Sequence, residues 1–524
     1  ETECAKLNTI VNSVMLNQLR LNRSTPLAML YSSYSMGGLE YSSFQVIQDQ
    51  KGLLLMLKHL RWNGTIGQDL LVTISAIQLV SGMCEPIMES VNSPMRCVAN
   101  GWISHLRRRL AAMNGFLWIE REQTQKLQRL NDQSIVSSFE GNPLLSDADK
   151  EKANFCRIYS RCCTYADLAD ASGRWIPGGR LDGKWRFESR LRWMDIPKPP
   201  PSYWQAYRRC IRTSVTTMTR AGRLSQPLPL LLPLGPWRLD GHHGCHDVYR
   251  NATHAFRREG SSFVSYHTPR NRVFTKGAAV SNLPDDVHPI SARWNDSELW
   301  TSQQYEIVPP LPLQPRSAIT SISRTGGPNM AGSDGSMNPV TGARGSSSAI
   351  QFNGMLYEGN RRFSTSRYST SYRSELEGIY VTQQIATEIG YEDALTQIVY
   401  SAHAITSTNV KLRNAHQTLD PEADLVLAIQ HQQATAKWTT KAEWEKSHQD
   451  DTKREEELSD EARFNRDRDL AAKAIQAYGQ IECGIPYVGS GAMLNLRGEW
   501  ITTKYAERIR DAVMEPQFKK FFLE

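Results

Sequence analysis

Apolar residues recur at helical spacing through the first quarter of the chain. Segments 44–61 and 102–113 place them three and four positions apart, the repeat of an amphipathic helix. Five leucines between positions 53 and 60 form one apolar face, which predicts packing in a helical core. Serine, glycine and proline residues separate these segments. We therefore expect residues 1–130 to form an α-rich region.

The pattern changes after this region. A helix is expected over 152–171, and the stretch 180–223 then contains 11 Lys and Arg against 3 Asp and Glu, interleaved with Trp and Tyr. Basic groups neutralise phosphates and aromatic rings stack on bases, so Arg186, Arg192 and Trp193 are candidate substrate contacts. A solvated basic face with the tryptophans in the core explains the same composition. Residues 131–234 are interpreted as a basic, aromatic connector.

Short apolar runs between turn residues predict a β-rich module over 235–305, with strands near 262–266 and 272–275. This module contains His242, His243, Cys245 and His246. Imidazole and thiolate are zinc ligands, but these four residues are packed too closely and no second ligand pair follows, so a turn is the better interpretation. Prolines at 309–315 and the Ser, Thr and Gly residues after them predict a linker over 306–326.

Beyond the linker the pattern alternates between strand and helix. It predicts strands at 329–336, 346–353, 355–365, 396–401 and 438–446, and helices at 371–388, 405–415, 421–432 and 459–478. We expect an α/β domain over 327–480, with a five-stranded mixed sheet flanked by helices. Residues 481–524 are then a C-terminal extension. The expected fold class is thus multidomain.

Length and composition predict the number of domains and the cellular location of the protein. The 524 residues are too many for one core, and the net charge of +7 is mild. We expect no membrane span, because no apolar run reaches about 18 residues, and no secretory signal, because the first 20 residues lack its pattern. Nine scattered cysteines argue against a disulfide framework and for a reducing, intracellular location, nucleus or cytoplasm. The first residue, Glu1, suggests a fragment of a longer chain.

Four short motifs follow one another on the predicted elements of the last region. They are Ser-Asp-Gly-Ser at 333–336, Ser-Tyr-Arg-Ser-Glu-Leu-Glu-Gly at 371–378, Ser-His-Gln-Asp-Asp at 447–451 and Asn-Arg-Asp-Arg-Asp-Leu-Ala at 465–471. In this order and on these elements, they resemble type 1 RNase H over residues 327–480. The resemblance implies an endoribonuclease that cuts the RNA strand of an RNA–DNA hybrid.

Hydrolysis of a phosphodiester needs a deprotonated water and a stabilised leaving oxygen, and two Mg²⁺ (or Mn²⁺) ions supply both. Carboxylate oxygens are the ligands that such hard cations prefer. By the resemblance, Asp334 bridges both ions, Asp469 holds the ion that activates water, and Glu375 holds the other. His448 would assist proton transfer or product release, and Asn465 would contact the substrate. We interpret Asp450, Asp451 and Asp467 as solvated charges.

One position departs from the RNase H pattern. The family carries a further aspartate after the fourth strand, and Ala402 is aligned with it here, so one metal ion should be held weakly. The adjacent His403 is a poor substitute, since imidazole suits Mg²⁺ badly. We therefore expect hybrid binding with impaired cleavage. The alternative is a catalytically dead RNase H fold that binds nucleic acid or acts as a scaffold.

Much of residues 15–300 bears a looser resemblance, carried by Arg-Ser-Thr-Pro at 23–26 and Met-Gly-Gly-Leu at 36–39. These residues are similar to the region after the polymerase palm in non-LTR-type reverse transcriptases of retroelements. The resemblance implies a thumb-like and connector region, and the polymerase part of the same polyprotein as a possible partner. Tyr-Ala-Asp-Leu at 165–168 lacks the second aspartate of a polymerase site, so the palm is absent.

Overall fold

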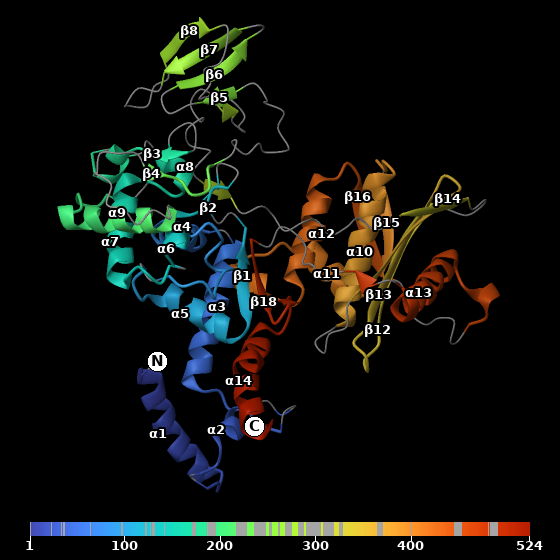
Figure 1. The fold of residues 1–524 in the computed structure, drawn as a ribbon. Helices are drawn as coiled ribbons and strands as arrows, with labels where there is room; N and C mark the ends of the chain where they lie inside the picture. The colour runs from blue at the N-terminus through green and yellow to red at the C-terminus, as the bar shows by residue number, and fades with distance from the viewer. Residues whose placement is uncertain are drawn as a thin grey trace. The chain divides into compact units, whose positions relative to one another are not determined.

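The computed structural model describes residues 2–523 with gaps, the longest at 170–173, 187–194, 216–227, 235–247, 268–274, 281–287, 290–304, 308–318, 324–328, 364–369, 445–452 and 483–490. The chain divides into two compact units. The first unit comprises residues 1–68, 112–120 and 309–524, and the second comprises 69–111 and 121–308. Figure 1 labels most of the helices and strands of both units.

A mixed β-sheet forms the centre of the first unit. Its strands run in the order β11 (Thr320–Ser323), β14 (Met355–Phe363), β13 (Arg344–Phe352), β12 (Met330–Met337), β15 (Ala394–Val399) and β16 (Thr439–Trp444). β17 (Ile481–Glu482) pairs with β14 in parallel. β12, β13 and β14 form an antiparallel meander, whereas β15 is parallel to both β12 and β16.

Helices cover both faces of this sheet. α10 (Ser371–Glu388) and α13 (Asp460–Tyr478) lie on either side of it (Figure 1). Alternate residues of a strand point to opposite faces, and a Cβ at Gly332 would meet Phe464 of α13, whereas one at Gly335 would meet Ser374 of α10. α11 (Ala402–Asn409) and α12 (Ala423–Thr435) complete this part. Buried Leu, Ile and Val residues of α10 and α12 form the core beneath them.

The first unit also contains the two ends of the chain. Its remaining elements are α1 (Thr2–Gln18), α2 (Leu27–Tyr31), α3 (Phe44–Trp62) and α14 (Tyr505–Leu523), with an antiparallel sheet of β1 (Gly115–Ile119), β18 (Ala492–Leu496) and β19 (Glu499–Ile501). Buried Arg61 of α3 joins these segments. It donates to the Ala492 and Thr418 carbonyls at 2.7 and 2.8 Å and to the Tyr505 hydroxyl at 2.8 Å.

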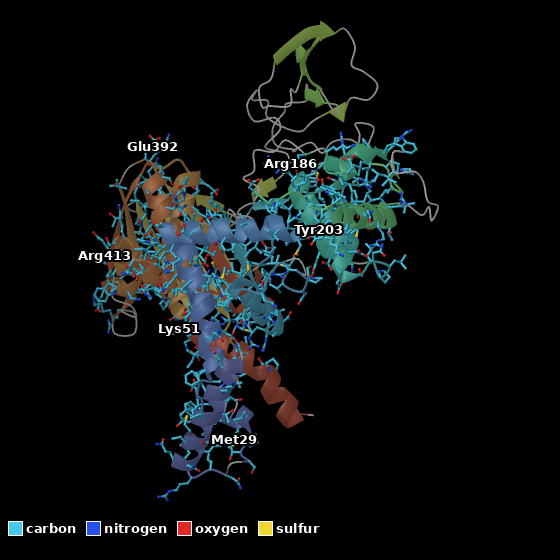
Figure 2. All side chains as sticks on the ribbon, turned by 90° about the vertical axis from the view of Figure 1, so that its left-hand side faces the viewer. Met29, Lys51, Arg186, Tyr203, Glu392 and Arg413 are labelled. Carbon is cyan, nitrogen blue, oxygen red and sulfur yellow. The ribbon has the colours of Figure 1, made fainter. Side chains whose placement is uncertain are left out.

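The second unit begins as a helical bundle. It contains most of α4 (Thr65–Ser81), α5 (Trp102–Ala112), α6 (Ile135–Glu140), α7 (Asp147–Ser160), α8 (Tyr165–Leu168) and α9 (Pro201–Val215), with short strands β2 (Gln123–Gln125), β3 (Trp175–Ile176), β4 (Leu228–Pro229) and β10 (Tyr305–Ile307). Trp204 and Tyr207 of α9 are buried in its core, with ring centroids 5.8 Å apart. Figure 2 labels Tyr203, whose ring packs edge-on against Phe155. These aromatic residues therefore pack in the protein core, the second of the two interpretations of the basic stretch.

Five strands pair antiparallel within residues 248–289. They are β5 (Val248–Arg250), β6 (His254–Glu259), β7 (Ser262–His267), β8 (Thr275–Val280) and β9 (His288–Pro289), in the order β8-β7-β6-β5-β9. These strands lie within the stretch 235–305 that was expected to be β-rich. The proposed zinc cluster at 242–246 lies outside the described residues.

Two strands correct the sequence interpretation. β1 falls in the region expected to be α-rich, because the continuous apolar run Gly-Phe-Leu-Trp-Ile carries no strand period but fits a buried strand. β11 falls in the expected linker and adds an edge strand, so the central sheet has more strands than the five expected. Among the described helices, none has the length and apolarity needed to cross a membrane.

Candidate active site

Asp334 lies in the middle of β12, one residue beyond the last pair that this central strand forms with β15. The parallel register pairs the preceding residue, Ser333, with Val399 of β15, so Asp334 lies where β15 ends. Its side chain is 3% exposed and accepts a hydrogen bond from the Gly335 amide at 2.8 Å. The carboxyl ends of parallel strands share one edge of a sheet, and loops at that edge commonly carry functional groups.

Glu375 reaches the same place from the other face of the sheet. It lies in the second turn of α10, a helix capped by the Thr370 hydroxyl. The strand and helix approach so closely that a Cβ on Gly335 would lie 2.3 Å from the Ser374 carbonyl carbon and 2.4 Å from the Glu375 amide nitrogen. Glycine is therefore required at this contact, which holds the start of α10 against β12.

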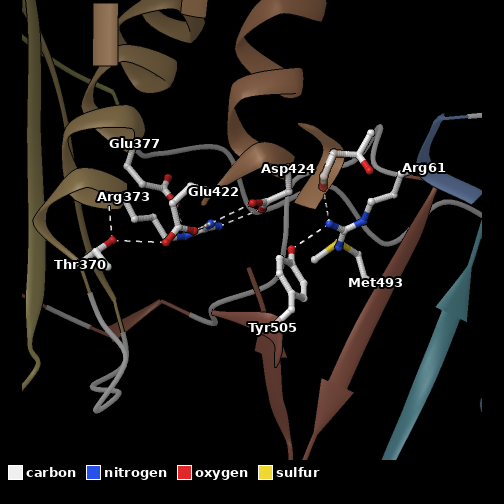
Figure 3. A network of polar contacts seen from close by, with 9 residues as sticks. Arg61, Thr370, Arg373, Glu377, Glu422, Asp424, Met493 and Tyr505 are labelled. Carbon is white, nitrogen blue, oxygen red and sulfur yellow. Dashed lines mark hydrogen bonds and ion pairs between the residues drawn. The ribbon is translucent and has the colours of Figure 1, made fainter. Parts of the chain in front are cut away.

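A buried polar network fixes the amino end of α10 (Figure 3). Arg373 contacts Glu422 at 2.6 Å, both carboxylate oxygens of Asp424 at 3.1 Å, and Glu377 at 3.6 Å. Burial lowers the pKa of Arg373, but the charges of Asp424, Glu422 and Glu377 outweigh it and raise the pKa well above its usual value. The network thus holds the helix turn that carries Glu375.

Asp469 extends from α13 and completes a group of three carboxylates with Asp334 and Glu375. Its side chain is partly buried, and its Oδ2 lies 2.7 Å from the ammonium of Lys473, one turn later. The side chains of Asp469 and Glu375 both lie close enough to Asp334 to raise its pKa or to have their own pKa raised by it. The structure therefore brings together three of the acidic residues that the sequence singled out.

The pKa values of Asp334 and Glu375 depend on the neighbouring carboxylates. Burial and the charge of Asp469 raise the pKa of Asp334 to about 7, against the smaller opposing effects of the Gly335 amide and Lys473. Burial and the charge of Asp334 raise the pKa of Glu375 well above its usual range. Crowded, buried carboxylates hold protons because their charged forms repel one another. A cation among them would remove this repulsion.

The carboxylate group fits a divalent cation by its chemistry. Its ligand atoms are all carboxylate oxygens, and Oε2 of Glu375 is buried without a hydrogen-bond partner among the described residues. Nevertheless, no set of three or more His, Cys, Asp or Glu side chains in the described part has the spacing of a ready-made metal centre. Side-chain adjustment would therefore accompany metal binding.

The segment after β15 brings no fourth carboxylate. Ala402 is the exposed first residue of α11. The residue before it, Ser401, caps the helix, and its hydroxyl accepts from the Ala404 amide at 3.2 Å. Aspartate is a favoured cap in this position, so Ser401 is a second candidate for the missing acidic position, signalled in the sequence by a serine at a helix start. The ring of His403 lies 4.8 Å from that of Tyr372.

Two further predicted residues differ in their placement. Asn465 lies one turn before Asp469 but is fully buried, and neither of its amide atoms has a hydrogen-bond partner within the described structure. Direct contact with a substrate would require it to become exposed. His448 lies outside the described residues.

The predicted contacts in the basic stretch belong to the second unit. Arg186 (Figure 2) donates to the Tyr159 carbonyl at 2.9 Å, and its guanidinium lies 4.5 Å from the centre of the Tyr159 ring. This arginine packs within its own unit. Arg192 and Trp193 fall in a gap of the described chain.

Comparison with known proteins gives only partial similarities. No protein-family model matches the chain, and no curated protein matches it. Among solved structures, an N-terminal RNase H domain from Mycobacterium tuberculosis, fused to maltose-binding protein, aligns over 28% of this chain and 93% of its own, with 13% identity and a TM-score of 0.21. RNase H1 from Halobacterium salinarum aligns over 22% and 85%, with 12% identity and a TM-score of 0.18. The protease–reverse transcriptase of prototype foamy virus aligns over 34% and 24%, with 13% identity and a TM-score of 0.23.

Proposed function

We propose that the α/β part of the first unit binds RNA–DNA hybrids in the manner of an RNase H and cleaves the RNA strand weakly. One observation carries the proposal: Asp334, Glu375 and Asp469, far apart in sequence, meet at one edge of a sheet. When bound there, divalent Mg²⁺ or Mn²⁺ would supply charge stabilisation for phosphodiester hydrolysis. The three carboxylates would hold the ions, with one of two ions held poorly.

Impairment follows from the segment 401–402, which has a hydroxyl and a methyl group but no carboxylate. Loss of one ligand weakens charge stabilisation at the leaving oxygen and should reduce turnover strongly. The alternative function is a hybrid-binding or scaffold protein without catalysis, and the same missing carboxylate favours it. Both versions keep the substrate-binding surface of the fold.

Cleavage of a labelled RNA–DNA hybrid in Mg²⁺ and in Mn²⁺ tests the proposal. We expect slow cleavage by the natural chain, abolished by Asp334→Asn. Ser401→Asp and Ala402→Asp are compared in parallel, and the variant that restores activity identifies the missing position. If hybrid binding persists while every variant stays inactive, the scaffold function is correct. If neither binding nor cleavage occurs, both versions are wrong.

The wider context is also proposed. We infer that the chain is the portion of a retroelement reverse transcriptase polyprotein that follows the polymerase palm, with a nuclease domain at 327–480 to which the flanking strands β11 and β17 add. The motif resemblances support this assignment. Co-purification with the polymerase portion of the same polyprotein, and cleavage by the joined chain, would test it.

A further inference from the structure

Lys473 is the cation nearest to the carboxylate group in the described interactions. It lies one helical turn after Asp469 on α13, and its ammonium is 2.7 Å from Asp469 Oδ2. Asp469 belongs to α13 and is grouped with carboxylates of β12 and α10, so one lysine opposes the mutual repulsion of side chains from different elements.

This ion pair differs from an ordinary surface pair. The side chain of Lys473 is 52% exposed, but that of Asp469 is only 17% exposed and Asp334 is buried. Exposed pairs at this spacing contribute little, because water and salt screen them. Water and salt screen the charge of Lys473 less where it acts on a buried group of carboxylates. The lysine is thus placed where excess negative charge most needs a counter-ion.

The same oxygen of Asp469 would be needed by a divalent ion. A metal ion at this carboxylate would lie within a few ångströms of the ammonium, and the two positive charges would repel each other. Lysine is a flexible side chain, and half of it is already in solvent. It can therefore leave Asp469 without any rearrangement of α13.

We propose that Lys473 is an internal counter-cation: it stabilises the metal-free carboxylate group and competes with a divalent ion for Asp469. The proposal rests on the function proposed above, because the competing ion is the one assigned to these carboxylates. Lys473 thereby sets the metal concentration at which the site fills, and the metal-free protein remains folded below that concentration.

The experiment compares the natural chain with Lys473→Met, measuring Mn²⁺ affinity by calorimetry and thermal midpoint in chelator. Removing the competing charge should tighten Mn²⁺ binding by on the order of tenfold and lower the midpoint of the metal-free chain. Lys437→Met is the matched control, because Lys437 pairs with Glu392 on the surface, where the side chains are 82% and 70% exposed. It should change neither quantity.

The outcomes separate the two proposals. Equal or weaker Mn²⁺ binding by Lys473→Met, relative to a natural chain that does bind, overturns the role of the lysine and leaves the metal site standing. Failure of both chains to bind Mn²⁺ overturns the metal site and the competition together. An unchanged midpoint in chelator also contradicts the counter-cation role.

Discussion

Replacing Arg373 by methionine removes the cation at the centre of the buried network in Figure 3. The arginine side chain is 8% exposed, and its partners Glu422, Asp424 and Glu377 are 1%, 0% and 1% exposed. Methionine fills a similar volume but leaves buried carboxylates without their main partner. Breaking a buried ion pair from one side typically costs about 3–5 kcal/mol. Arg361, 3.9 Å from Glu377, and the Thr370 hydroxyl, which donates to Glu422 at 3.3 Å, stay in place.

Urea unfolding at neutral pH, followed by circular dichroism, measures this loss. We expect the free energy of unfolding to fall by roughly 3–5 kcal/mol, a large part of the ~5–15 kcal/mol typical of a domain. Lys437→Met serves again as the surface control and should change the value by less than about 1 kcal/mol. A second comparison adds Glu422→Gln and Asp424→Asn to Arg373→Met, which removes the stranded charges and should recover part of the loss.

The reasoning would be refuted if Arg373→Met lowered the free energy of unfolding by less than about 1 kcal/mol, the range of exposed pairs. It would also fail if the triple variant, which keeps only the Glu377 charge, were no more stable than the single one. Because the network holds the turn of α10 that bears Glu375, hybrid cleavage should fall in parallel with stability.

Three further predictions follow from the site. In chelator, the free energy of unfolding of the natural chain should decrease from about pH 4 to about pH 7, because the raised pKa of Asp334 makes the folded state bind more protons than the unfolded state. The slope approaches ~1.4 kcal/mol per pH unit for one proton. Urea titrations measure it, and Asp334→Asn should flatten it. Gly335→Ala should lower the free energy of unfolding by about 1–3 kcal/mol, because the added methyl group meets the backbone of α10. Gly179→Ala is the control. A methyl group on Gly179 contacts no described atom within 4 Å, so the unfolding midpoint should stay nearly unchanged. Hybrid affinity, measured by fluorescence anisotropy, should fall steeply with added salt, and a flat salt response would contradict phosphate recognition.

The sequence predicted the central elements well where local pattern decided them. α10 begins and ends where the pattern placed it, and the strands near 330, 344, 355, 394 and 439 differ from expectation by a few residues. β1 could not be told from a helix, because a short apolar run has no period. Three of the four residues of β11 are small and polar, and its pairing with β14 is decided by the neighbouring strand.

The site was predictable only in part. The order of the motifs pointed to Asp334, Glu375 and Asp469. Their meeting also depends on close packing between β12 and α10 at Gly335 and Gly378, which the sequence shows only as two glycines. The spacing of Asp469 and Lys473 could have signalled their pair, since residues four apart on a helix are neighbours. Arg373 lies about 50 positions from its main acidic partners, so no local pattern could connect them.

The pairing of β1 with β18 has a consequence for synthesis of the chain. Phe116 pairs with Asn495, so the first of these strands leaves the ribosome hundreds of residues before its partner exists. Chains with such distant contacts fold slowly, and exposed strand edges favour aggregation meanwhile. This sheet can close only after residues 492–496 have been synthesised, and a truncated product ending before residue 492 would leave the apolar β1 without its neighbour.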